Sequence, residues 1–470
     1  MSFLTLLCLA CLSSTSSLRT GVLAATPPSE LFSPLIAQKI SQIASNFSSP
    51  TLYPQYTDSS GKWLYFPTDT WTTGFFPALL YSLNTRASFC KTSSSNDGLN
   101  ETDWLTLAWG WSAPEVGLET NNSVGHDVGF LSFPFQEELT LDSTNQSAVD
   151  SVNAFANDLA VRFDPTVGCT RSWDSSDPTD FMVIIDNMMD LDVLFVSANL
   201  TGNDTLRQIA ISHADKTIEN HVRNDGSSFH LVEYNQTTGS VIRRGTVQGY
   251  ADNSTWSRGQ SWGIYAFAQM EKKVERPAVY QNTGEQHYLD TSRRMATYFV
   301  TNIPSSGIVP WDFNAPDDGS RPADSSAATI ASSALLLLSD TEQSLSPANS
   351  SGAAYWRDLA VQVLANTTAS FWNPNWQSLL SNGTDNNRLD PPINDTGIIY
   401  GDYYFVQAGN QLLQAGLVNC SGSANSSALN NPNSSGPGPK NSYATYNTVP
   451  LHLQTLVLVL LCTLSFSLIL

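Results

Sequence analysis

Positive charge is scarce in this chain. Of its 470 residues, 22 are Lys or Arg and 42 are Asp or Glu, which gives a formal net charge of −20 at pH 7. A protein that binds nucleic acid needs basic residues to neutralise phosphates, so this balance argues against a nucleic-acid partner. It also disfavours a polyanion spread over the surface, although a local cationic site can still bind a small anionic sugar.

Cysteine is rare as well, and three of the six cysteines lie in apolar segments at the two ends of the chain. Cys90, Cys169 and Cys420 remain for the central region. An odd number leaves at least one thiol unpaired, and three cysteines do not make a disulfide framework. The hydrophobic core must therefore stabilise the fold, and about 400 residues suffice to bury one. Because the sequence also lacks a metal-ligand cluster and a nucleotide-binding loop, we expect no metal and no other cofactor.

Both ends of the chain have the composition of processing signals. Residues 1–24 contain an apolar run followed by small residues, which predicts a secretory signal peptide, although no basic residue precedes the run. Residues 451–470 are hydrophobic, but their uncharged run is shorter than the roughly 20 residues of a membrane span. A spacer rich in Ser, Asn, Pro and Gly, residues 421–450, precedes them. This layout predicts a glycosylphosphatidylinositol anchor signal, and a span of marginal length is the alternative.

The region between the two ends is rich in N-glycosylation sequons, as is typical of exported proteins. Sequons of the form Asn-x-Ser/Thr recur from Asn46 to Asn433, and this density fits a surface coated with glycans. We therefore expect a secreted or cell-surface protein, attached to the membrane through a lipid anchor.

Residues 27–420 are expected to form one domain, because no linker-like segment interrupts them. Stretches with helical period alternate there with clusters of Gly, Pro, Asn and Asp. The stretches are Trp71 to Leu83, Phe181 to Leu200, Asp204 to Val222, Arg258 to Lys273, Tyr288 to Ile303, Asp324 to Leu338, Ala353 to Phe371 and Thr396 to Leu417. Phe181 to Leu200 is apolar almost all round, which predicts a buried helix, and Ser228 to Tyr234 is the best short strand. The pattern indicates an all-α fold of packed helix pairs, either an (α/α) barrel or a solenoid of helical hairpins.

Asp186 is the most informative residue, because it lies in the apolar stretch Val183 to Leu191. Burial destabilises the charged form of a carboxyl and raises its pKa, which a general acid requires. The plainer interpretation is a structural Asp that bonds to backbone or to Asn187. Asp190 and Asp192 follow without a comparable context.

The segment Gly125 to Phe130 contains a second candidate pair. Its glycines let the backbone approach a ligand, and the adjacent His126 and Asp127 supply a hydrogen-bond donor and a carboxylate. The alternative is a turn in which Asp127 bonds its own backbone.

A third segment, Gln248 to Trp262, combines aromatic, amide and guanidinium groups. Aromatic rings stack on sugar faces and Arg binds carboxylates in a bidentate manner, so this composition suits an anionic sugar. The alternative is a helix start with Trp262 in the core and Arg258 paired with a carboxylate. His230 lies in the short strand, where it could equally be a plain buried histidine.

At these segments the sequence resembles the unsaturated glucuronyl hydrolases, family 88 of the glycoside hydrolases. The similarity continues, in order, through Trp71 to Pro77, Val309 to Phe313, Asp324 to Ala328 and Ile399 to Tyr404. Each motif alone is weak, but the ordered set covers nearly the whole central region. The resemblance implies an (α/α)6 barrel over residues 27–420.

The resemblance also implies a reaction and the residues that perform it. Such enzymes hydrate the C4–C5 double bond of the unsaturated uronic acid that polysaccharide lyases leave at a non-reducing end, and the hydrated sugar then releases its aglycone. Asp186 matches the residue that protonates C4 and helps deliver water to C5, and Asp127 matches its partner carboxylate. The residues that match the lining of the sugar site are Trp71, His126, His230, Gln248, Trp256 and Arg258.

Electrostatics lead to two expectations for this site. Asp186, in apolar surroundings, should keep its proton, whereas Asp127, on a glycine-flanked loop nearer water, should titrate lower and be ionised. Arg258 is expected to bind the uronate carboxylate through charge-assisted hydrogen bonds.

Three alternatives to this function remain. An unsaturated rhamnogalacturonyl hydrolase shares the reaction on a related barrel, although Trp256 and Arg258 together favour the glucuronyl enzyme. An α-mannan-processing enzyme uses adjacent aspartates, and the pair present here, Asp317-Asp318, lies in a loop flanked by Pro and Gly. A non-catalytic wall glycoprotein that binds sugar would not need the acidic pair. The sequon at Asn253, beside the Trp256 loop, bears on which substrate the site accepts.

Overall fold

A computed structural model of the chain describes residues 26–46, 50–91, 98–175, 177, 180–271 and 283–423. The expected signal peptide (1–24), the anchor signal (451–470) and all but the start of the spacer (421–450) lie outside the described residues. All described residues belong to one structural unit. Within these ranges, no helix combines the length and apolar character that a membrane span requires.

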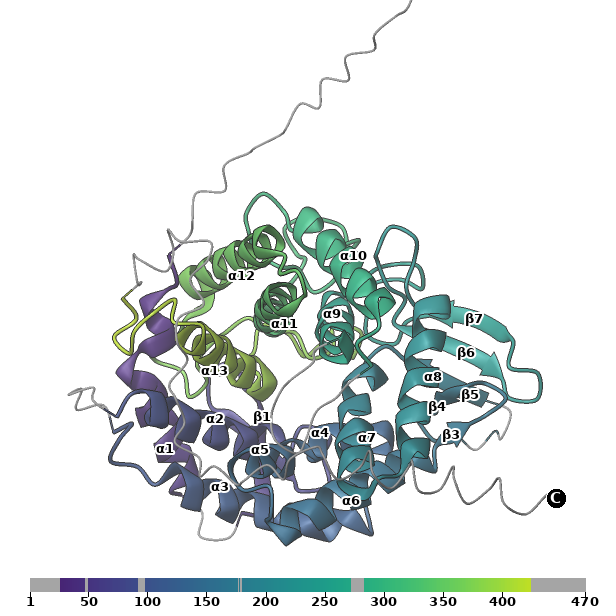
Figure 1. Cartoon of the computed structure of the whole chain (residues 1–470). Coiled ribbons are helices and arrows are strands. Elements are labelled where there is room, and N and C mark those ends of the chain that lie inside the picture. The colour runs from purple at the N-terminus through teal and green to yellow at the C-terminus, as the bar shows by residue number, and fades with distance from the viewer. Residues whose placement is uncertain are drawn as a thin grey trace, which may run out of the picture. The chain divides into compact units, whose positions relative to one another are not determined.

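The inner ring consists of helices that are buried on most sides (Figure 1). Its members are α2 (Phe75–Phe89), α5 (Phe133–Leu141), α7 (Asn187–Thr201), α9 (Ser257–Glu271), α11 (Ser325–Ser344) and α13 (Ile399–Gln414). Neighbouring members pack together, and the short helix α4 (Val128–Leu131) connects α5 to α7. The last member, α13, packs back against α2, so the ring is closed. This closure rules out a solenoid and confirms the (α/α)6 barrel.

The helices of the outer ring bury one face and expose the other. Its members are α1 (Pro34–Ala44), α3 (Trp104–Ser112), α6 (Gln146–Ala160), α8 (Asp204–Asn220), α10 (Gln286–Asn302) and α12 (Ser350–Phe371). From α3 onward, each outer helix packs on the inner helix that precedes it in the chain. In α10, for example, Leu289, Ser292, Met295, Ala296 and Phe299 face the core at intervals of one helical turn. The described residues also include the short 3-10 helices η1 (Ser29–Phe32), η2 (Ala113–Glu119) and η3 (Gly125–Asp127).

Short antiparallel strands accompany the two rings. They form a hairpin of β1 (Leu52–Thr57) and β2 (Trp63–Pro67), a pair of β3 (Phe163–Asp164) and β4 (Cys169–Thr170), and a sheet in the order β5 (Asp180–Ile184), β6 (Leu231–Asn235), β7 (Val241–Gly245). The strand expected at Ser228 to Tyr234 is therefore present as β6, slightly later in the chain.

The stretch Phe181 to Leu200, expected as one buried helix, is strand β5 followed by helix α7. An apolar run gives the same pattern in a buried strand and a buried helix, so period alone does not separate the two. The β-branched Val183 and Ile184 pair with Val232 and Leu231 of β6, and this pairing fixes the strand. The correction matters because Asp186 lies at the junction and not inside a helix.

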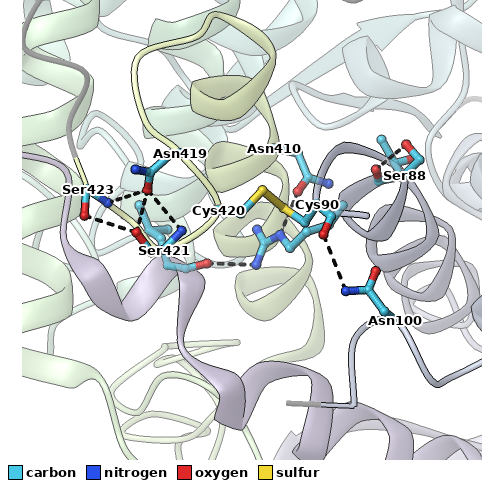
Figure 2. Close-up of a disulfide and its surroundings, with 11 residues drawn as sticks. Ser88, Cys90, Asn100, Asn410, Asn419, Cys420, Ser421 and Ser423 are labelled. Carbon is cyan, nitrogen blue, oxygen red and sulfur yellow. Dashed lines mark hydrogen bonds between the residues drawn. A yellow bond between two sulfur atoms is a disulfide. The ribbon is translucent and has the colours of Figure 1, made fainter. Parts of the chain in front are cut away.

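One disulfide reinforces the closure of the ring. Figure 2 shows Cys90, at the C-terminal end of α2, bonded to Cys420, which follows α13. The two cysteines are 330 positions apart in the sequence, so the bond constrains a long loop of the unfolded chain. Beside it, Arg86 donates to the carbonyl oxygens of Leu31 and Val406, and Asn410 donates to that of Ser82. Cys169 is free and buried, which identifies the odd cysteine that the sequence left unassigned.

Candidate active site

The predicted site residues converge where the inner helices begin. Trp71 lies in the turn before α2, Asp127 precedes α4, Asp186 precedes α7, and Arg258 lies in the first turn of α9. Because the inner helices run in one direction around the ring, their N-terminal ends meet at the same end of the barrel. The ring thus brings together residues from four distant parts of the chain.

Asp186 occupies the connection between β5 and α7. The preceding residue is held in the sheet, since the Ile185 amide donates to the His230 carbonyl at 2.9 Å. The Asp186 residue is 8% exposed, and its Oδ2 is buried with no hydrogen-bond partner among the described residues. Burial raises the pKa of the Asp186 carboxyl to about 6, although His126 and Arg258 lower it in part. An unpaired, protonatable carboxyl of this kind is suited to proton transfer.

Asp127 ends the 3-10 helix η3, which starts at a glycine with a φ of +71°. A side chain at Gly125 would collide with the Ser172 carbonyl oxygen, so this approach requires glycine. Burial raises the pKa of Asp127 to about 7, and the negative charges of Asp190 and Asp186 raise it further against the opposing effect of His126. The expectation that Asp127 titrates below Asp186 is therefore wrong. Burial, which the glycine-flanked loop did not lead us to expect, is the main cause, and the neighbouring carboxylates add to it.

His126 lies between two carboxyls and is completely enclosed. Its Nδ1 is 2.7 Å from Asp190 Oδ2, and its Nε2 is 3.6 Å from Asp127 Oδ1. Asp190 was not selected from the sequence, yet it follows Asp186 by four residues, the spacing that puts two side chains on one face of a helix. That spacing is the signal that could have identified it.

His230, the residue just before strand β6, faces Asp186. Its Nδ1 accepts a hydrogen bond from the Val247 amide at 3.1 Å, so the neutral ring carries its proton on Nε2. That Nε2 is 3.7 Å from Asp186 Oδ2. Burial, together with the charge of Arg258, lowers the pKa of His230 to about 3, which keeps the ring neutral. His230 can therefore donate a hydrogen bond beside Asp186 without carrying a charge.

Arg258 is buried, and most of its hydrogen-bond donors already have partners within the protein. Its Nη2 donates to the Asp385 carbonyl at 2.7 Å, and its Nη1 donates to the Thr384 carbonyl and lies 3.5 Å from Asp324 Oδ2. The guanidinium also stacks on Trp256 and Tyr400, with centroid distances of 4.5 and 5.2 Å. Only Nε has no partner among the described residues. This arrangement favours a role in holding the segment around residues 384–385 over bidentate binding of a uronate.

Three other predicted residues differ in what they present to the site. Trp71 is half-buried on Phe130 and Tyr400, so part of its indole face is open to a sugar. Gln248 is half-buried, and its backbone oxygen accepts from the Trp311 indole at 2.9 Å. Trp256 is 2% exposed and packs at 4.8 Å from the His230 ring, which makes it a support for that ring. The roles of all eight residues stay predictions.

Further residues shape this end of the barrel without having been selected. Asp312 accepts from the Tyr250 amide and the Ser254 hydroxyl, and thus fixes the loop that carries Gln248 and Trp256. Arg388 is an exposed cation whose Nη1 donates to the Gly249 carbonyl at 3.3 Å, on the same loop.

The alternative acidic pair, Asp317-Asp318, is exposed and engaged in its own loop. Asp317 pairs with Arg321 at 3.0 Å, and Asp318 accepts from Ser320. Among the described residues, no group of three or more His, Cys, Asp or Glu side chains is arranged to hold a metal ion.

Comparison with known proteins gives a consistent result. An unsaturated glucuronyl hydrolase of Formosa agariphila is 33% identical over 350 residues, which are 73% of this chain and 80% of that protein. The crystal structure of an unsaturated glucuronyl hydrolase from Bacillus sp. GL1, responsible for the degradation of glycosaminoglycan, superposes with a TM-score of 0.68 at 26% identity, over 82% of this chain and 95% of the other. A variant of such an enzyme with dGlcA-Glc-Rha-Glc gives a TM-score of 0.70 at 26% identity, over 82% and 96%. No protein-family model matches the chain.

Proposed function

This chain belongs to the unsaturated glucuronyl hydrolases, which are glycoside hydrolases, and from this premise we propose that it hydrates the C4–C5 double bond of an unsaturated uronic acid at the non-reducing end of an oligosaccharide. The observation that carries the proposal is the pair of buried carboxyls, Asp127 and Asp186. Their pKa values are raised to about 7 and about 6, and each faces an imidazole nitrogen.

Two carboxyls with raised pKa values supply both the acid and the base that hydration needs. In the proposed reaction, Asp186 delivers a proton to C4, and a water molecule loses a proton to the pair as its oxygen bonds to C5. His230 donates from Nε2 beside Asp186 and remains neutral. The half-buried face of Trp71 supports stacking of the sugar ring.

Hydration places a hydroxyl and the ring oxygen on the same carbon, C5, which makes a hemiketal. This opens to a ketone at C5 and leaves the anomeric carbon with a hydroxyl and the aglycone oxygen. The hemiacetal then collapses to an aldehyde and releases the aglycone as an alcohol. One water is consumed in total, and the glycosidic bond breaks without a displacement at the anomeric carbon, unlike the usual two-carboxylate hydrolysis.

We expect purified protein to consume unsaturated uronide disaccharides with loss of the ultraviolet absorbance of the vinyl ether. The pair is competent when it carries one proton that can pass to Asp186 for delivery to C4, so the rate should fall below about pH 6, where both carboxyls are protonated, and above about pH 7, where both are ionised. A bell-shaped profile with its optimum on the acid side should result. A panel of glucuronyl and rhamnogalacturonyl substrates, each with saturated counterparts as controls, separates the alternatives. Consumption of the rhamnogalacturonyl substrate alone would replace the proposed specificity, and no consumption of either would refute the reaction.

We also propose that the enzyme is secreted and held at the cell surface by a glycosylphosphatidylinositol anchor. The Cys90–Cys420 disulfide supports an oxidising compartment, and the density of sequons supports export. Phospholipase C treatment of membranes from the producing cells should release the protein, and a chain truncated after residue 423 should appear directly in the medium. Detection of the peptide Leu456 to Leu470 in mature protein by mass spectrometry would contradict the anchor.

A further inference from the structure

Asp190 is a buried carboxyl that the proposed chemistry does not use directly. The residue has no exposed surface, and its Oδ2 is 2.7 Å from His126 Nδ1. Its second oxygen, Oδ1, is buried without a hydrogen-bond partner among the described residues. A carboxyl with an unsatisfied oxygen costs folding free energy, and an apolar side chain of the same volume would avoid that cost. Stability therefore does not explain an aspartate at this position.

The backbone of α4 leaves room for this carboxyl. A β-carbon added to Gly129 would lie within 2.3 Å of Asp190 Oδ1 and 2.4 Å of its α-carbon. Only glycine therefore permits α4 and α7 to approach this closely, and the approach brings His126, just before α4, onto Asp190. The contact joins the two segments that carry Asp127 and Asp186.

We propose that Asp190 is a positioning residue for the reaction: it holds the His126 ring so that Nε2 faces Asp127, and it sets the protonation of that nitrogen. The inference rests on the proposed function, because it concerns the same carboxyl pair. Asp190 does not touch the reacting atoms in this account and acts through His126.

The number of protons that His126 and Asp190 hold between them decides what Nε2 of His126 presents to Asp127. At 2.7 Å, one proton lies between Nδ1 and Oδ2, whichever atom formally owns it. When His126 and Asp190 together hold a second proton, that proton is on Nε2, and His126 donates toward an ionised Asp127. When the second proton is lost, Nε2 is a bare acceptor, and Asp127 must be protonated to face it. Burial raises the pKa of Asp190 well above its usual value, which favours the first state, because a protonated Asp190 donates to Nδ1 and leaves the ring's own proton on Nε2.

Other charged groups lie around His126 and Asp190, and some raise the pKa of His126 while others lower it. Burial lowers the pKa of His126; the charges of Asp127 and Asp186 oppose this effect in part, and Arg162 adds to it. The buried rings of His213 and His230 also lie within electrostatic range of His126. Both of these rings have lowered pKa values and are neutral, so they place no charge beside His126. Asp190 is the carboxyl that is hydrogen-bonded to His126.

Asp190→Asn tests the proposal with little change of shape, because the amide can still hydrogen-bond to Nδ1 but cannot share a proton with the ring as the carboxyl does. We expect kcat to fall roughly 10- to 100-fold with little change in KM, the size typical for loss of a group that orients a functional histidine. Asp192→Asn is the matched control: Asp192 is on the same helix, has a pKa also raised by burial, and faces Glu137. It should leave kcat unchanged.

A second measurement does not depend on activity or on a variant. The chain has six histidines, so nitrogen-15 labelling of histidine gives few signals to assign. In the wild type, His126 Nδ1 should share a strongly hydrogen-bonded, downfield-shifted proton, and Nε2 should be protonated near the pH optimum. A bare Nε2 there, or an unchanged kcat in Asp190→Asn, would overturn the proposal. Wild-type turnover of the disaccharide judges the proposed function separately.

Discussion

Replacement of Asp186 by asparagine should lower turnover by roughly 100- to 10,000-fold, the range for loss of a group that transfers a proton in the rate-limiting step. Asn has the same shape and polarity but neither gives nor takes a proton at C4. The substrate contacts remain, so KM should change little. The measurement is the rate of loss of vinyl-ether absorbance under saturating substrate, with circular dichroism to establish that the variant is folded.

The environment of Asp186 makes this test sharp. Its Oδ2 has no hydrogen-bond partner to lose among the described residues, so the substitution should not destabilise the fold. It should also remove the limb of the pH profile near pH 6 that belongs to the singly protonated pair. Near-normal turnover in folded Asp186→Asn protein would mean that Asp127 alone, or another residue, performs the proton transfer.

Replacement of Arg258 by alanine should cost about 3–5 kcal/mol in the free energy of unfolding and abolish most activity. The substitution leaves Asp324 as an unpaired buried charge and removes the donors to the Thr384 and Asp385 carbonyls. It also opens a cavity between Trp256 and Tyr400. Arg258→Lys should have an unfolding free energy between those of the wild type and Arg258→Ala, because one ammonium cannot bridge two carbonyls and stack on two rings at once.

Arg388→Ala is the matched control for the loss of a guanidinium, since Arg388 is exposed on the neighbouring loop. Thermal and denaturant unfolding should show no change for it beyond a few tenths of a kcal/mol. The contrary result for Arg258→Ala is an unchanged unfolding free energy with a raised KM. That outcome would restore the earlier expectation that Arg258 binds the uronate carboxylate and does not hold the chain around residues 384–385.

The sequence determined the elements whose signal is local. The period of Asp324 to Leu338 predicts a helix, and in the structure every residue from Ser325 to Leu338 of α11 is buried. The helical period of Tyr288 to Ile303 likewise predicts helix α10. Helical period is a property of neighbouring residues, so it is legible without the fold. The ordered motifs identified the family for the same reason, because each is a short local pattern.

Only the tertiary structure decided the partners of these elements. Period did not separate strand β5 from helix α7, because the pairing of Val183 with Val232 comes from a segment 49 positions later (232 − 183). Closure of the ring by α13 on α2 depends on contacts between the two ends of the domain, as does the choice of Cys420 for Cys90.

The same limit applies to the chemistry of the site. Desolvation and charge depend on every group within a few ångströms, and the groups around Asp127 come from separate segments. The sequence could identify the carboxyls but not the order of their pKa values. Two further features arise only when the barrel brings distant segments together. His126 pairs with Asp190, and Arg258 donates to carbonyl groups 126 and 127 positions later in the chain.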